Sequence, residues 1–197
     1  TKISKPNPGD TVIVPGAAGG VGSLAGQIFK IAGCNVYGIA GGKEKCEMLI
    51  NDFGFDGAID YKSENLNESL GKLCPNGADI VYDNVGGRIL NDCLLHLALN
   101  ARIAICGIIS RHKTDNMNFG PENYSNLIFK RATMQGFLML DYVSETVVAR
   151  KKMKKWIEDG KLICKEDLRE GFENAPDTLK GLFDGKNKGK QLLKIAD

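Results

Sequence analysis

The sequence has little of what metal sites, disulfide frameworks and membrane spans require. Two of its 197 residues are histidines, His96 and His112, and neither has a partner at ligand spacing, so we expect no metal site. The six cysteines stand singly, without a Cys-x-x-Cys pair, which favours reduced thiols over disulfides. No apolar run approaches the roughly 20 residues of a membrane span, and no signal-peptide pattern is present. We therefore expect a cytoplasmic protein that neither binds a metal nor spans a membrane.

The sequence also lacks an excess of charge of either sign. Its formal net charge of +2 is too small to indicate a nucleic-acid partner. The lysine-dense stretch 150–155 lies among apolar residues at helical spacing, including Met153 and Trp156, so we interpret it as the solvated face of an amphipathic helix. The length of 197 residues and the hydrophobic content of 43% are typical of a globular protein with one good core.

A glycine-rich turn near the start of the chain is its most informative feature. The turn follows a β-branched strand at 11–14 and precedes apolar residues that recur at helical spacing from 21 to 32. Its spacing, Ala17-x-Gly19-x-x-Gly22, is a dinucleotide-binding fingerprint with alanine in place of the first glycine. Backbone N–H groups at the start of such a helix, without side chains around them, suit a pyrophosphate. The fingerprint predicts cofactor contacts at Ala17, Gly19, Gly20, Val21 and Gly22; the alternative is a glycine turn in an ordinary α/β unit.

Strands and helices alternate along the following 120 or so residues, which predicts a doubly wound parallel sheet. Further strands are expected at 35–40, 58–61, 78–83, 102–106 and 134–140, and helices at 43–53, 63–73, 88–97, 124–130 and 144–160. We expect an α/β fold of the Rossmann type, with strand order 3-2-1-4-5-6 and a ligand crevice at the carboxyl ends of strands 1 and 4. The polar stretch 110–122 is longer than a plain connection and is predicted to be a functional loop.

The end of the second strand bears on the choice between NADPH and NADH. An acidic residue there would bind the ribose of NAD, but this chain has Ala40-Gly41-Gly42 followed by Lys43 and Lys45. Space and positive charge suit a 2′-phosphate, so we expect NADPH. NADH remains the alternative. The lysines could be solvated first-turn residues, and Glu44 could reach the ribose.

The glycine spacing also fits the short-chain dehydrogenases, whose chemistry needs Tyr-x-x-x-Lys. None of the five tyrosines has a lysine four residues further on, so that class is excluded.

A series of motifs along nearly the whole chain resembles the zinc-independent medium-chain dehydrogenase/reductases, in particular the branch of leukotriene/prostaglandin reductases, 2-alkenal double-bond reductases and curcumin reductase. These motifs are GAAGGVG at 16–22, GQ at 26–27, GGKEKC at 41–46, GFD at 54–56, DYK at 60–62, YDNVGG at 82–87, ARIAICG at 101–107, GFENAP at 171–176 and GKNKGK at 185–190. The resemblance implies an NADPH-dependent reductase of α,β-unsaturated ketones and aldehydes, an enone or enal substrate, and a homodimer formed through the sixth strand.

The resemblance also implies roles for individual residues. Lys45 and Tyr61, with Gly41 beside them, would hold the 2′-phosphate. The nicotinamide end would be lined by Asn84, Cys106, Ser110 and Asn187. Each has a structural alternative: Tyr61 as a strand-end residue, Cys106 as a core residue, and both asparagines as turn formers.

Two departures from the family pattern affect the function. The family has a tyrosine two residues after the serine equivalent to Ser110, where this chain has His112, which can donate a proton but titrates near neutrality. A solvated loop residue is the alternative for His112. The family's N-terminal GroES-like substrate domain is absent, so we expect an NADP-binding Rossmann domain at 1–161 and a segment at 162–197 that returns toward the missing domain. A non-catalytic NADPH-binding redox sensor on the same fold remains the alternative function.

Overall fold

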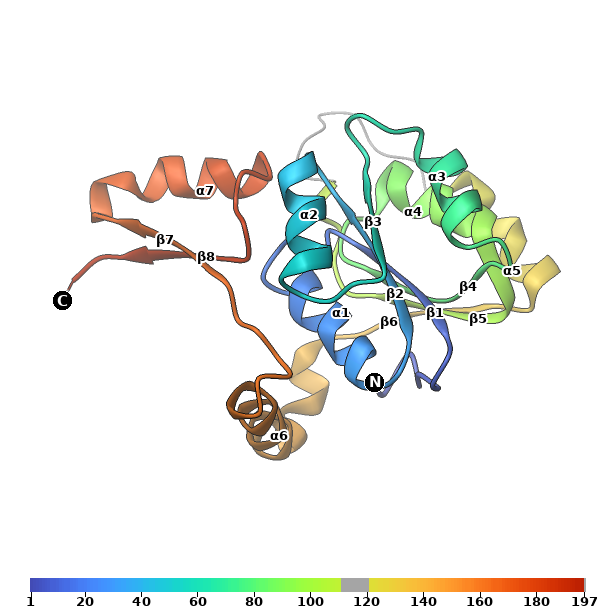
Figure 1. Ribbon diagram of the computed structural model, residues 1–197, viewed down its shortest axis with the longest axis horizontal. Coiled ribbons are helices and arrows are strands. Elements are labelled where there is room, and N and C mark those ends of the chain that lie inside the picture. The colour runs from blue at the N-terminus through green and yellow to red at the C-terminus, as the bar shows by residue number, and fades with distance from the viewer. Residues whose placement is uncertain (111–120, 197) are drawn as a thin grey trace.

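The chain folds into a six-stranded parallel sheet flanked by helices, with a smaller unit at its C-terminus (Figure 1). The structure, a computed structural model, describes residues 1–110 and 121–196. The strand order is β3-β2-β1-β4-β5-β6. This doubly wound order and the α/β class are those predicted from the sequence.

The elements of the sheet alternate as strand and helix from the first to the last. The strands are β1 Thr11–Pro15, β2 Asn35–Ala40, β3 Gly57–Asp60, β4 Ala78–Asp83, β5 Leu97–Ile105 and β6 Thr133–Gly136. The α-helices are α1 Gly22–Ile31, α2 Lys43–Asn51, α3 Leu66–Leu73, α4 Gly87–Cys93, α5 Asn126–Lys130 and α6 Thr146–Glu158. Short 3₁₀-helices are η1 Leu94–His96, η3 Glu122–Ser125 and η4 Met139–Glu145.

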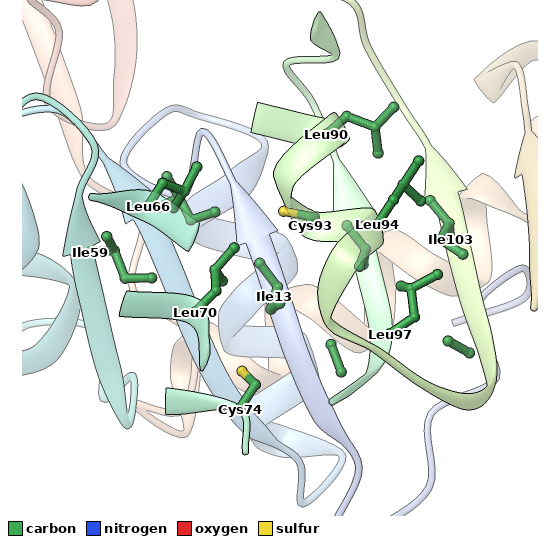
Figure 2. Packing of buried hydrophobic residues seen from close by; sticks show 14 residues of the cluster. Ile13, Ile59, Leu66, Leu70, Cys74, Leu90, Cys93, Leu94, Leu97 and Ile103 are labelled. Atoms are coloured by element: carbon green, nitrogen blue, oxygen red, sulfur yellow. The ribbon is translucent and has the colours of Figure 1, made fainter. Parts of the chain in front are cut away.

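Two apolar cores lie on opposite faces of the sheet, because side chains alternate along each strand. Ile13 of β1 packs with residues of α3, α4 and η1 on one face, as Figure 2 shows for Leu70 and Leu94. Val12 and Val14, its neighbours in sequence, pack on the other face with residues of α1 and α2. The continuous β-branched run of β1 therefore reflects a strand that is buried on both sides.

The edge of the sheet differs from the sequence-based expectation. The sixth strand was expected to reach Leu140, but β6 ends at Gly136 and the chain turns into η4. Apolar side chains alone do not extend a strand, and Leu138, Met139 and Leu140 are exposed. The helix expected at 144–160 begins at Thr146, and Ser144 does not cap it. Similarly, β5 starts at Leu97, where the fourth helix was expected to end.

The C-terminal unit consists of β7 Glu166–Glu170, the 3₁₀-helix η5 Phe172–Asn174, α7 Ala175–Phe183 and β8 Lys190–Lys194. β7 and β8 pair in parallel and are connected through α7. They lie beside the main sheet (Figure 1). The sequence predicted the helix and the last strand but missed β7, whose single apolar residue, Leu168, gives no strand pattern. That 162–197 belongs to a second domain stays a prediction.

Two features anchor this unit to the sheet domain. The side chain of Gln27 in α1 donates to the carbonyl of Ile163 at 3.0 Å and accepts from its N–H at 2.7 Å. Leu162 is buried beside this contact. The chain then returns to the glycine turn, where the Gly189 N–H donates to the Ala18 carbonyl at 2.8 Å. The C-terminal unit therefore lies against the start of α1. Within the described residues, no helix has the length and apolar character needed to cross a bilayer.

Close packing between α1 and the loop before β3 gives a first prediction. A Cβ at Gly26 would lie 2.0 Å from the ring of Phe55, which is itself buried. We expect Gly26→Ala to lower the free energy of unfolding by about 1–3 kcal/mol, although alanine is the better helix former. Denaturant unfolding measures this change.

The matched control is Gly71→Ala in α3, where the nearest atom to a new Cβ is 3.5 Å away. This substitution should stabilise the protein by about 0.5–1 kcal/mol. Equal effects at the two positions would contradict the packing constraint at Gly26.

Candidate functional site

A cavity of about 550 Å³ opens at the carboxyl ends of the central strands. All predicted site residues except Ala17 and His112 line it: Gly19, Gly20, Val21, Gly22, Gly41, Lys45, Tyr61, Asn84, Cys106, Ser110 and Asn187. Ala17 is fully buried under the turn, and Gly16 and Ala18 line the cavity instead. His112 lies outside the described residues. The roles of these residues toward a cofactor stay predictions, but the structure brings them to one place.

The glycine turn is held so tightly that side chains are excluded from it. A Cβ at Gly22 would lie 2.3 Å from the carbonyl oxygen of Gly16. A Cβ at Gly20 would lie 2.9 Å from the side chain of Lys190. No side chain caps the start of α1 and no acidic residue lies in its first turn. The amino-terminal end of α1 is therefore suited to a phosphate.

Lys45, Tyr61 and Gly41 form one end of the cavity, as the sequence indicated. Tyr61 lies over Gly41, where a Cβ would be 3.0 Å from the tyrosine oxygen. Lys45 donates from Nζ to the carbonyl of Gly185 at 2.6 Å. Burial, together with the positive charges of Lys62 and Lys188, lowers the pKa of Lys45. A partly buried ammonium among other cations is a favourable place for an anionic group.

Asp60, at the end of β3, organises this end of the cavity, and sequence reasoning did not assign it a role. Its carboxylate accepts from the N–H of Gly42 at 2.7 Å, the N–H of Lys62 at 3.0 Å and the hydroxyl of Ser63 at 2.8 Å. Burial alone would raise the pKa of Asp60, but these hydrogen bonds outweigh it and lower the pKa. A stably ionised Asp60 therefore fixes the turn at 41–42 relative to Tyr61 and Lys62.

Asn84, Cys106 and Ser110 lie at the turns that follow β4 and β5, whereas Asn187 comes from the C-terminal unit. The amide of Asn84 donates to the Pro15 carbonyl at 2.9 Å and so ties the end of β4 to the end of β1. Cys106 is hydrogen-bonded to Tyr82, and burial first, then this bond, raises the pKa of Tyr82. The hydroxyl oxygen of Ser110 is buried and has no hydrogen-bond partner in the described part of the chain. An unpaired hydroxyl at a cavity is a group that a polar ligand can satisfy.

Asp83, the last residue of β4, stabilises the neighbouring turns, and sequence reasoning did not assign it a site role either. Its carboxylate is fully buried and accepts from the N–H groups of Val85 and Gly86, each at 3.0 Å. Burial raises the pKa of Asp83 despite these bonds. Its carbonyl accepts from the N–H of Cys106 at 2.8 Å. Asp83 therefore holds the turns after β4 and β5 together.

The C-terminal unit supplies the remaining wall. Asn187 is buried and donates to the Gly189 carbonyl at 2.9 Å, which shapes the turn over the glycine loop. Leu182, Phe183 and Gly185 also line the cavity. Asn187 was expected here from the family resemblance, but Leu182 and Phe183 reach the cavity only because the tail folds back, and no local sequence pattern indicated them. Glu44, which could have competed for the ribose, is paired with Lys188 and does not line the cavity.

The sheet order, the glycine turn and the cavity above it define a dinucleotide-binding domain of the Rossmann type. Residues 20–155 match a family model described as zinc-binding dehydrogenase, and the chain belongs to that family. Despite this description, no group of three or more metal-ligating side chains is found among residues 1–110 and 121–196.

Several relatives carry the reductase names that the motifs indicated. The chain is 41% identical to a 2-alkenal reductase (NADP(+)-dependent) of Nicotiana tabacum, over 99% of this chain and 57% of that protein. It is 38% identical to an NADPH-dependent curcumin reductase of Escherichia coli, over 98% of this chain and 58% of that protein. The structure of CurA from Vibrio vulnificus in complex with NADPH superposes with a TM-score of 0.94 at 41% identity, covering 100% of this chain and 60% of that chain. The chain thus spans less than two thirds of these relatives.

Proposed function

We propose that this chain is the NADPH-binding part of an oxidoreductase that reduces the carbon–carbon double bond of α,β-unsaturated ketones and aldehydes. The observation that carries the proposal is one cavity over the glycine turn that is lined by Lys45, Tyr61, Asn84, Cys106 and Asn187 together. The relatives named as 2-alkenal and curcumin reductases support the reaction class.

The residues present fit a dinucleotide. The glycines pack so closely that a Cβ at Gly22 would collide with the Gly16 carbonyl oxygen and a Cβ at Gly41 with the ring of Tyr61, so both positions require glycine. The buried hydroxyl of Ser110 lacks a partner among the described residues. A volume of about 550 Å³ lies within the range of small-molecule sites. Each of these observations favours a bound cofactor over an unspecialised turn.

In this proposal the chain binds and orients, and bound NADPH supplies a hydride to the β-carbon of the substrate. Lys45 and Tyr61 hold the 2′-phosphate, and the start of α1 holds the pyrophosphate. Asn84, Cys106, Ser110 and Asn187 fix the nicotinamide end, which aligns the reacting carbons. Proton donation by His112 remains part of the proposal, as does chemistry without a metal. The six free thiols support a reducing, cytoplasmic location.

We further propose that two copies associate through the edge of the sheet at β6. Large apolar side chains lie exposed beyond this edge, including Leu140 and Val147, which are 73% and 76% exposed. Several exposed large apolar side chains in one segment, such as Leu138, Met139 and Leu140, favour an interface there. Pairing of the two edges across a two-fold axis would cover it.

The association can be tested by sedimentation at micromolar concentration, where we expect a dimer. Leu140→Asp should yield a monomer, because a buried, unpaired carboxylate opposes the interface. The matched control is Leu168→Asp in the C-terminal unit, also an exposed leucine, which should remain dimeric. A monomeric unsubstituted chain would contradict the proposal.

Cofactor choice can be tested at Lys45. Lys45→Ala should weaken NADPH binding about ten- to a hundredfold, the value of one charge-assisted hydrogen bond, and leave NADH binding nearly unchanged. Titration calorimetry with each cofactor measures both effects. Lys43→Ala is the control, since Lys43 is almost fully exposed on the same helical turn. Equal losses for the two cofactors would rule out a 2′-phosphate role.

The role of the chain within the whole enzyme can be tested with the 197 residues alone. We expect them to bind NADPH but to reduce a simple enone very slowly, because we place the wall that holds the substrate in the part of the relatives that these 197 residues do not cover. Orientation contributes roughly 7–11 kcal/mol to such steps, and losing about half of it slows the reaction on the order of a thousandfold. Loss of nicotinamide absorbance measures the rate. Ordinary enzymatic turnover would place the substrate site within this chain.

A further inference from the structure

An ion pair joins the two parts of the chain beside the ribose end of the cavity. Lys188, in the turn before β8, contacts the carboxylate of Glu44 in the first turn of α2. Neither side chain lines the cavity, and they are 41% and 75% exposed. Any influence of this pair on a cofactor is therefore exerted through charge and through the position of Glu44.

The backbone around Lys188 is fixed on both sides, so its side chain is directed toward α2. Its own N–H donates to the carboxylate of Asp167 at 3.2 Å. The next N–H, that of Gly189, donates to the Ala18 carbonyl at 2.8 Å. The pairing with Glu44 thus follows from the fold and does not depend on a flexible tail.

Four charged side chains act on Lys45. Lys62 and Lys188 act on Lys45 as like charges, and Asp167 and Glu44 as opposite charges. The pairing with Lys188, and more weakly the charges of Lys165 and Lys45, lower the pKa of Glu44. Glu44 therefore stays ionised at neutral pH, one residue away from the lysine assigned to the 2′-phosphate.

Without Lys188, the carboxylate of Glu44 has Lys45 and Lys165 as its remaining cations. A pairing with Lys45 would compete with a phosphate for the same ammonium, and the negative charge would repel the phosphate. A carboxylate near this end of the second strand is also the group that binds the ribose hydroxyls of NAD. Freeing Glu44 would therefore disfavour NADPH and would not disfavour NADH.

We propose that Lys188 is a positioning residue for cofactor choice: it withdraws Glu44 from the ribose end and leaves Lys45 available for a 2′-phosphate. This inference rests on the proposed NADPH binding. Because the pair is largely exposed, its influence is modest, about two- to fivefold in the ratio of the two affinities. The influence also falls as salt screens the charges.

The experiment compares the dissociation constants of NADPH and NADH, measured by titration calorimetry on the full chain at low and high salt. Lys188→Met should weaken NADPH binding about two- to fivefold without weakening NADH binding, and the difference should shrink at high salt. Lys188→Arg should retain the original preference. Adding Glu44→Gln to Lys188→Met should restore it. The matched control is Lys186→Met, in the same turn, where the lysine pairs with Asp184 at 4.0 Å.

Three results would overturn the inference while leaving the proposed function intact. Lys188→Met could leave the preference unchanged, or weaken both cofactors equally. The double variant could remain as weak toward NADPH as Lys188→Met, in which case Lys188 would act on the phosphate directly. If the unsubstituted chain fails to bind NADPH, the proposed function itself fails.

Discussion

The close approach of backbone to backbone at the glycine turn is the constraint on which the rest of the structure depends. With a new Cβ at Gly22 only 2.3 Å from the Gly16 carbonyl oxygen, β1 can pass into α1 only if that position lacks a side chain. This tight passage places the start of α1 beneath the cavity. The same small surface receives the turn at 189–190, whose Lys190 packs over Gly20. β1, α1, the cavity and the C-terminal unit therefore all meet at the glycine turn.

Much of the fold could be predicted from the sequence because its central elements carry their own pattern. The limits of β2 and β4 coincide with the predicted ones, since each is a short run of apolar residues between turn signals. The pattern fails where tertiary contacts decide. β7 consists almost entirely of charged residues and exists because β8 pairs with it. Beyond Gly136, apolar residues suggested a longer β6, but the chain turns into η4 at that point.

The site residues likewise fall into those that a local sequence pattern predicted and those that it did not. Glycine spacing and the lysines after β2 pointed to residues that line the cavity, because those signals are local. The carboxylates that hold the loops in place, Asp60 and Asp83, were not assigned roles, although both stand at strand ends, where such a role is reasonable to suspect. The wall from α7 gave no signal at all, since its residues reach the cavity only through the folding of the last quarter of the chain. Ala17 is the opposite case: the fingerprint predicted a cofactor contact there, but Ala17 lies beneath the cavity and does not line it.

The hydrogen bond between Ala18 and Gly189 joins residues that are 171 positions apart in the sequence, and this has a consequence for how the molecule acquires its site. Contacts between neighbouring strands and helices close short loops and form early at little entropic cost. The cavity wall instead forms only when Gly189 contacts Ala18, far from it in the sequence. As the chain emerges from the ribosome, the sheet can assemble long before its ligand site is complete. The capacity to bind is therefore acquired only after Gly189 has been synthesised.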